Sequence, residues 1–322
     1  MIDFRYHLVS IIAIFLALTL GIVLGSTVLE DPLIRSAEAT SNQLSQTNEE
    51  LREQVRGLEA QSQGAQTFIQ SAMGPLVKEK LTGQRVLLVE APGAGSAQRE
   101  SIGAAIEAAG GTVVGRVSFT EKFLTKADAG VVDEMSTRLR PSSMTFPPAA
   151  TPYDKAATVL AGALMLPTVL PEGKETPPSK TILATFEEAG WLTLGENREQ
   201  RATLAVVVAS ALPYEGETAA EQTAAVVSLA VGLDTASRGA VLVGQQAAAA
   251  EGGPIALLRD AEAKSAVSTV DNIDMASGQL AMDFALHDQI EGVTGHYGLG
   301  DGTTAFAPAP APAATPTPDS GG

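Results

Sequence analysis

An uncharged run from Leu8 to Leu29 constrains this chain more than any other feature of its sequence. A helix rises about 1.5 Å per residue, so one of this length crosses a bilayer core of roughly 30 Å. Arg5 precedes the run and acidic residues follow it, so the positive-inside rule predicts a cytoplasmic N-terminus at residues 1–7 and an extracytoplasmic remainder. A cleaved export signal is the alternative, although its apolar region is usually only about 7–15 residues long. We predict a retained, single-pass transmembrane helix over residues 8–29 in the cell membrane.

The transmembrane segment carries small residues at every fourth position, namely Ala13, Ala17, Gly21 and Gly25. Residues four apart lie on one helix face, and small side chains on that face let a second helix backbone approach closely. Gly and Ala are also common in membrane helices in general, but four such positions in register are more specific. This face predicts an interhelical contact, either with a second copy of the chain or with a different membrane protein.

Residues 30–74 form a polar segment that is rich in Gln, Glu and Ser and predicts a coiled-coil stalk. Apolar residues recur there every seven positions as Leu44, Leu51 and Leu58, and a second, half-polar seam holds Asn48 and Val55. A buried Asn on such a seam fixes the register and favours a defined oligomer. We expect a parallel dimer or a pairing with a partner membrane protein. The alternative is an amphipathic helix that lies on its own domain.

A globular α/β domain is predicted over residues 84–300. Short, continuously apolar segments such as "RVLLVE" are typical of buried parallel strands, and Ala-rich helical segments alternate with them. The pattern predicts an open, mainly parallel, Rossmann-like sheet with five strands and helices on both faces. The expected strands are 85–90, 112–119, 202–210, 239–245 and 266–273, and the expected helices are 96–109, 217–237, 254–263 and 275–290.

Two further segments complete the predicted organisation. Residues 121–195 contain helical runs such as "TILATFEEAGWLTL" (181–194) between Pro-rich loops, and we interpret them as a helical insertion between the two halves of the sheet. Residues 301–322 are rich in Ala, Pro and Thr and are predicted to be a disordered tail.

The composition excludes several classes of function. The formal net charge is −16, so the chain offers no basic surface for nucleic acid. It has no cysteine, which excludes disulfides, thiolate metal sites and cysteine nucleophiles. Its three histidines are His7, His287 and His296, and a Gly-x-Ser-x-Gly motif is absent. The Gly-rich segment "APGAGS" lacks the third glycine of a dinucleotide fingerprint and the lysine of a phosphate loop. We therefore predict no catalytic residues and no cofactor.

Candidate metal ligands occur near the last predicted helix. Asp283 and His287 are four residues apart and so share a helix face, and Met282 lies beside them. The same residues suit a packed helix, and the dense Met or His runs of copper-capture sites are absent, so no metal site is assigned. Upstream, Asp271 and Asp274 are candidates for a hard cation, although Asn272 or Asp274 is more readily explained as the cap of the helix that follows.

Three segments of the sequence carry a family resemblance. The start "MIDFRYHLVSIIAIFLALTLGIVLGS", the Gln/Glu-rich coil and "VSTVDNIDMASGQLAM…GHYG" resemble the actinobacterial copper transport protein B (MctB) family over all but the Pro/Ala tail. The resemblance implies a role in copper homeostasis or efflux, with an outer-membrane location and a pore. Copper is thus implied by resemblance only. Other members of this group, called SteB-like, are associated with cell-envelope separation beside a partner membrane protein.

The residues themselves argue against a literal pore. A membrane barrel needs strands that alternate apolar and polar residues, whereas the strands expected here are continuously apolar and alternate with helices. Two hypotheses follow. The chain is a non-enzymatic membrane protein of copper homeostasis, or it is a scaffold of the cell envelope and cell division that pairs with a membrane protein and docks or activates a cell-wall hydrolase.

Overall fold

The computed structural model describes residues 4–168, 174, 176–195, 200–260 and 266–308, with the side chains of residues 26–38 excepted. The chain divides into two units, residues 1–65 and 66–322. Helix α1 spans Phe4–Val77. It therefore contains both the predicted transmembrane segment and the predicted stalk, and it continues through Gly64 and Pro75.

The second unit is an α/β domain built on one sheet of seven strands in the order β3-β2-β1-β4-β5-β6-β7. All neighbouring pairs are parallel except β2 and β3, which are antiparallel. The chain moves outward from β1 to β2 and β3, and then crosses to β4 on the other side of β1. The predicted open, mainly parallel fold is thereby confirmed. The strands are β1 Arg85–Glu90, β2 Thr112–Phe119, β3 Leu192–Leu194, β4 Leu204–Val208, β5 Ala240–Val243, β6 Ser268–Val270 and β7 His296–Tyr297.

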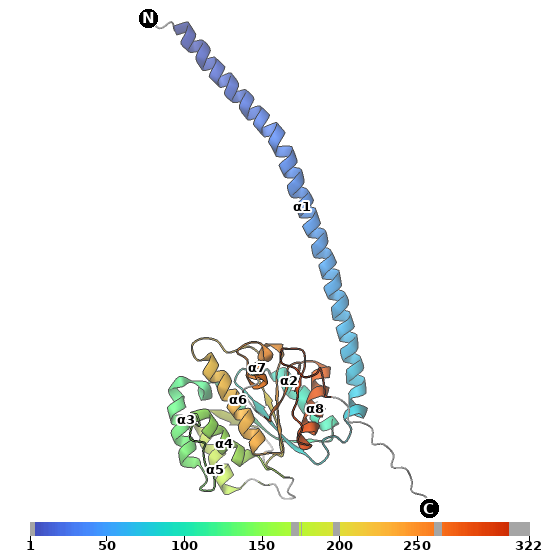
Figure 1. Cartoon of the computed structure of the whole chain (residues 1–322), viewed down its shortest axis with the longest axis vertical. Coiled ribbons are helices and arrows are strands. Elements are labelled where there is room, and N and C mark those ends of the chain that lie inside the picture. The colour runs from blue at the N-terminus through green and yellow to red at the C-terminus, as the bar shows by residue number, and fades with distance from the viewer. Residues whose placement is uncertain (1–3, 169–173, 175, 196–199, 261–265, 309–322) are drawn as a thin grey trace, which may run out of the picture. The chain divides into compact units, whose positions relative to one another are not determined.

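The helices of this unit cover both faces of the sheet (Figure 1). Alternate residues of β1 show the division, because Leu87 and Val89 belong to one core cluster and Val86 and Leu88 to the other. Buried residues of α3, α4, α5, α6 and α7 fill the first cluster, and those of α2, α8 and the end of α1 fill the second. The helices are α2 Ser96–Ala108, η1 Glu121–Leu124, α3 Lys126–Leu139, α4 Pro152–Leu164, α5 Pro177–Glu188, α6 Ala219–Thr235, η2 Gln246–Ala249, α7 Pro254–Arg259 and α8 Ala276–Ile290.

Local sequence signals explain several of these helix boundaries. Thr151 and Asp154 form a capping box at the start of α4, where each side chain accepts a hydrogen bond from the backbone N–H of the other residue. Thr176 caps α5 in the same way through the N–H of Ser179, with Pro177 at the first helical position. These caps satisfy N–H groups that would otherwise have no partner within the helix.

The sheet has two strands more than the five that were expected, β3 and β7. The prediction of helix throughout 181–194 was wrong, because α5 ends at Glu188 and Gly190 takes a positive φ of 74° that turns the chain. Trp191 is then buried with its ring edge-on to Phe186, and the next residues add β3 to the edge of the sheet. β7 holds only two residues, too few for an alternation that a sequence pattern would reveal.

The end of the described chain packs against β7. The N–H of Thr304 donates to the carbonyl oxygen of His296 at 2.7 Å, and Ala305 forms a bridge with Tyr297. Residues 301–308 of the predicted tail are thus described, whereas residues 309–322 lie outside the described part of the chain.

Candidate functional site

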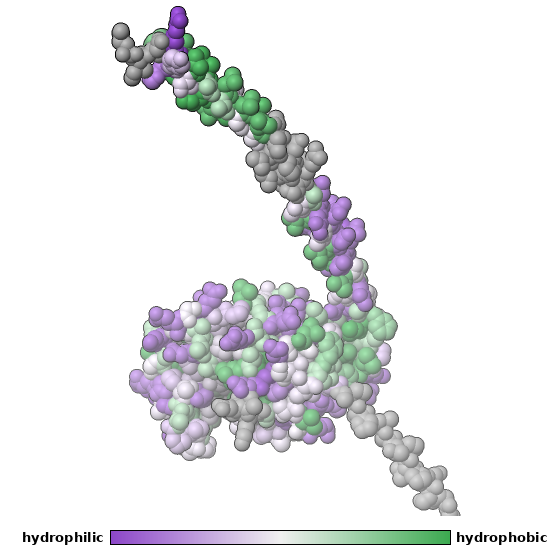
Figure 2. Space-filling view, turned by 45° about the horizontal axis from the view of Figure 1, so that its top comes forward, coloured by the Kyte–Doolittle hydropathy of each residue, from purple (hydrophilic) through white to green (hydrophobic). Residues whose placement is uncertain are grey.

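The first part of α1 exposes its apolar residues. The segment Phe4–Gly25 is long and apolar enough to cross a membrane, and none of its residues is buried. Figure 2 shows these residues as a band of hydrophobic colour near the N-terminal end of α1. The four predicted contact positions, Ala13, Ala17, Gly21 and Gly25, all lie in this exposed segment, and a side chain added at either glycine would meet nothing within 4 Å.

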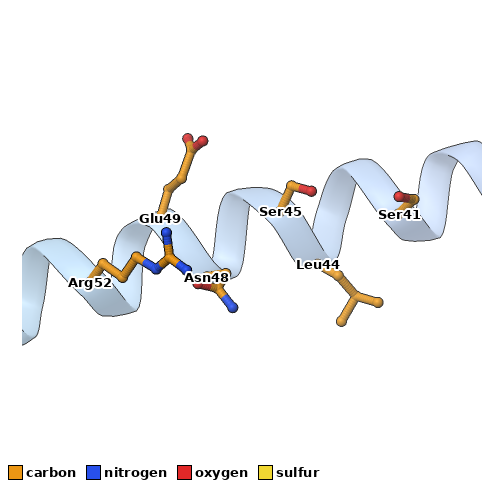
Figure 3. Close-up of a pocket in the computed structure, with 6 residues that line it drawn as sticks. All are labelled: Ser41, Leu44, Ser45, Asn48, Glu49 and Arg52. Atoms are coloured by element: carbon orange, nitrogen blue, oxygen red, sulfur yellow. The ribbon is translucent and has the colours of Figure 1, made fainter.

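The predicted stalk seam is also exposed. Leu44 and Leu58 are each 65% exposed, and Leu51 and Val55 each leave about half of their surface in solvent. A shallow groove on the surface of α1 is lined by Leu44, Asn48 and Arg52, together with Ser41, Ser45 and Glu49. Figure 3 shows Leu44 and Asn48 pointing to one side of the helix and Ser45 and Glu49 to the other. The seam residues therefore share a face that remains open.

The crevice that usually binds ligands in doubly wound folds lies where the strand order reverses, here between the carboxyl ends of β1 and β4. In this chain the loops after the two strands bond to each other across it. The N–H of Ala211 donates to the carbonyl oxygen of Gly93 at 3.0 Å, and the hydroxyl of Tyr214 donates to that of Pro92 at 2.9 Å. A Cβ at Gly93 would lie 2.7 Å from Ser210 Oγ. The segment "APGAGS" thus forms a packed turn.

Two ion pairs stabilise the same edge of the sheet. At the end of β1, Arg99 donates to both carboxylate oxygens of Glu90 at 2.5 and 2.8 Å, and Ser118 Oγ donates to the same carboxylate. At the end of β6, Arg259 Nη1 lies 2.7 Å from Asp271 Oδ2, and both side chains are almost fully buried, at 2% and 0% exposure.

The Arg259–Asp271 pair holds the Gly-rich segment that follows β7. Asp271 also accepts hydrogen bonds from the N–H groups of Leu299 and Gly300, and Arg259 donates to the carbonyl oxygens of Tyr297 and Asp301. Asp271 is therefore the buried counter-ion of Arg259, and the two side chains together hold the segment after β7 against the sheet.

The candidate metal ligands on α8 are arranged as follows. Met282 and Asp283 are both fully buried, but adjacent residues of a helix project about 100° apart. His287 is half-buried, and its Nδ1 lies 3.1 Å from the carbonyl oxygen of Lys80. Among the described residues, no group of three or more His, Cys, Asp and Glu side chains is placed to hold a metal ion. His296 pairs through Nδ1 with Thr269 Oγ1 at 3.1 Å, and burial lowers its pKa.

Two features near α8 had no sequence signal. The predicted cap from Asn272 or Asp274 is absent, because Met275 is the N-cap residue and makes no side-chain cap. Gln66 of α1 supplies the contact instead, since its Oε1 accepts from the N–H of Ala276 at 2.6 Å across a sequence separation of 210 residues. The second feature is the complete burial of Asp283, which a helical pattern of mixed polar and apolar residues did not reveal.

The comparisons with known proteins decide the family. The family model described as "Copper transport outer membrane protein, MctB" matches residues 1–308. The chain belongs to the MctB family. Proteins named copper transporter MctB from Mycobacterium tuberculosis and Mycobacterium bovis are each 29% identical to it over 310 residues, which cover 94% of this chain and 98% of the relative. The protein of that name from Mycobacterium leprae is 29% identical over 320 residues, with coverages of 95% and 98%.

The match to MctB proteins includes both units of the chain. Because the matched residues begin at 1 and end at 308, the apolar segment, the heptad segment and the α/β domain all belong to the shared region. The resemblance read from the three sequence segments is therefore confirmed.

Proposed function

We propose that this protein serves copper transport as a single-pass membrane protein without a catalytic step of its own, and that it works by assembling through α1. The observation that carries the proposal is the face of α1 on which Leu44, Leu51, Val55 and Leu58 lie exposed, in a chain that matches the MctB family from residue 1. Copper is the cargo in this proposal, and the N-terminus is cytoplasmic with the α/β domain on the other side of the membrane.

The heptad segment favours a parallel pair of identical chains. Leu44, Leu51 and Leu58 occupy the d positions, and Asn48 and Val55 occupy the a positions. Leucine at d with a β-branched residue at a favours two-stranded parallel coils, and a single Asn at a specifies the register. The exposed leucines should contribute most to pairing, because burying one leucine side chain at the interface stabilises the complex by about 1.5–3 kcal/mol.

Cysteine crosslinking in intact membranes tests this assembly. The chain has no native cysteine, so single-cysteine variants are unambiguous. Leu51→Cys should form a disulfide-linked homodimer, whereas Glu53→Cys, which projects about 200° away on the same helix, should not. Equal crosslinking of the two variants, or none at Leu51→Cys, would contradict the proposed pairing.

The small-residue face of the apolar segment is tested separately. Replacing Gly21 and Gly25 by leucine should separate the paired membrane helices, because the backbones could no longer approach closely. The measurement is the yield of the disulfide at Leu51→Cys. It should fall several-fold when Gly21 and Gly25 are both leucine, relative to the chain with the native glycines. Ile22→Leu, which changes a neighbouring face, is the control and should leave the yield unchanged.

Calorimetry distinguishes copper binding by a single chain from a copper role that depends on assembly. If the protein acts through assembly, titration of the detergent-solubilised full chain with Cu(I) should show no binding tighter than micromolar. A tight stoichiometric site would instead require a ligand set within one chain, and it would replace assembly as the basis of the copper role.

The open seam also favours a second candidate function. A partner membrane protein with a complementary heptad helix would cover Leu44, Leu51 and Leu58 as well as a second copy does. The protein would then be a cell-envelope scaffold whose α/β domain docks a cell-wall hydrolase. Crosslinking from Leu51→Cys decides between the two, because the scaffold predicts a heterodimer of a defined second protein.

A further inference from the structure

Asp283 is a buried carboxyl group for which the fold supplies no partner. Its residue exposure is 0%, and neither Oδ1 nor Oδ2 has a hydrogen-bond partner among the described residues. Burial raises the pKa of Asp283 to about 8, because the charged form loses its hydration. The group is therefore a protonated carboxylic acid at neutral pH, held inside the second core cluster of the α/β domain.

The position of Asp283 on α8 relates it to the last turns of α1 (residues 66–77). Ala276, Asp283 and His287 follow one another at intervals of seven and four, so they lie on one helix face. Ala276 is bonded to Gln66, and His287 is bonded to the carbonyl oxygen of Lys80, just beyond the end of α1. Asp283 lies between these two contacts along α8, and it shares its helix face with His287, one turn further on.

The surroundings of Asp283 are otherwise uncharged. The buried face of α2 consists of Gln98, Ile102, Ala105 and Ile106, and the buried residues of the α1 turns are Met73 and Val77. Strands β5 and β6, which also pack against α8, hold only uncharged residues. Titratable groups on the neighbouring turns are His287 and Asp288 on α8 and Lys80 after α1, and Asp288 accepts a hydrogen bond from the hydroxyl of Tyr297.

We propose that Asp283 is a proton-binding site that controls whether the last turns of α1 remain packed on α8. In the protonated state the neutral carboxyl group is tolerated in the core. When it releases its proton to solvent, the carboxylate has no counter-ion and no donor, so it must gain water. Water reaches it when the α1 turns separate from α8, which requires the Gln66 and Lys80 hydrogen bonds to break and Met73 and Val77 to leave the second core cluster.

Hydrogen exchange of the detergent-solubilised full chain tests the proposal. After correction for the intrinsic rate, exchange in residues 66–81 and in α8 should rise by up to about tenfold per pH unit between pH 5 and 8 and level off above that, because opening is coupled to the loss of one proton. Exchange in β1 and β4, which requires unfolding of the domain, should remain much slower than in these two segments at every pH, which distinguishes local opening from unfolding of the domain. Corrected exchange that does not change with pH in the first two segments would overturn the proposal.

Variants identify the titrating group. Asp283→Asn and Asp283→Leu both remove the ionisable carboxyl, and either should make the corrected exchange of both segments independent of pH. The leucine variant serves if the asparagine variant fails to fold, because an apolar side chain needs no partner in this core. Asp274→Asn, which removes an exposed acid just before α8, is the matched control and should behave like the wild type. Retention of the pH dependence in both Asp283 variants would assign it to another group.

Discussion

Leucine side chains are exposed in one unit of the molecule and buried in the other. In residues 4–65, Leu44, Leu51 and Leu58 lie at the surface, whereas in the α/β domain Leu88 and Leu242 have no exposed surface at all. The domain thus obtains its stability from its own two cores, while under the proposed function α1 would bury its apolar residues in a membrane over its first half and against another helix over its second. Mutations should therefore act on folding in one unit and on association in the other.

The largest effect is expected where the domain buries charge. In Arg259→Met, Asp271 loses its counter-ion inside the protein, which should lower the free energy of unfolding by about 3–5 kcal/mol. Urea unfolding followed by the fluorescence of Trp191, the one tryptophan in the sequence, measures the change. Arg138→Ala removes an exposed pair with Glu134 and should cost less than about 1 kcal/mol. A similar loss of unfolding free energy in the two variants would contradict the conclusion that burial makes the Arg259–Asp271 pair more important to stability than the exposed pair.

The next effect is a pH dependence that belongs to the domain alone. The unfolded carboxyl of Asp283 ionises near pH 4, but the folded one keeps its proton until about pH 8, so the folded state binds the extra proton between these values. Stability should therefore fall as pH rises from about 4 to 8, by up to about 1.4 kcal/mol per unit, and the loss should end above pH 8. Subtracting the unfolding curves of Asp283→Asn isolates this contribution. A difference that is constant with pH would contradict the buried state of Asp283.

A smaller effect should concern association. In the proposed pair, Asn48 of each chain is buried at the seam, where an amide costs stability but fixes the register. Asn48→Ile should tighten self-association by about tenfold or more, since an unsatisfied buried polar group costs about 1–3 kcal/mol. Analytical ultracentrifugation in density-matched detergent measures the constant, and the Trp191 unfolding transition should stay unchanged. Weaker association would place Asn48 outside the seam.

The last prediction compares a glycine of each unit, and its smaller effect is the one in α1. A side chain at Gly57 of α1 would meet nothing within 4 Å, so Gly57→Ala should stabilise the helix by up to about 1 kcal/mol. The same change at Gly278 of α8 would place Cβ 1.9 Å from the carbonyl oxygen of Asn272, and it should destabilise the domain severely. Thermal melts of circular dichroism check both variants. An unchanged melting temperature for Gly278→Ala would contradict the close contact between Gly278 and the carbonyl oxygen of Asn272.

The comparison also explains which parts of the fold could be predicted. Strands β1 and β2 lie within the residues expected for them, because a continuously apolar segment that is flanked by helices has few other stable arrangements. β3 was assigned to a helix because Trp191 to Leu194 continue an apolar pattern, and only pairing with β2 makes them a strand. β7 is too short to have a pattern of its own.

The candidate site divides in the same way. The open positions of α1 could be predicted, since periodicity places residues on a helix face without any knowledge of the rest of the chain. The burial of Asp283, its missing partners and the contact between Gln66 and Ala276 could not, because each depends on residues that are far apart in sequence.

By itself, the sequence determined the apolar segment, the heptad pattern and the alternation of strands and helices, because hydrophobic periodicity acts over one or two turns of chain. Only the tertiary structure decided that Tyr214 bonds across the Gly-rich crevice, that Asp271 pairs with Arg259 and that Asp283 has no hydrogen-bond partner among the described residues. The physical reason is that the electrostatic state of a side chain depends on its burial and its neighbours, and these are set by the packing of distant segments.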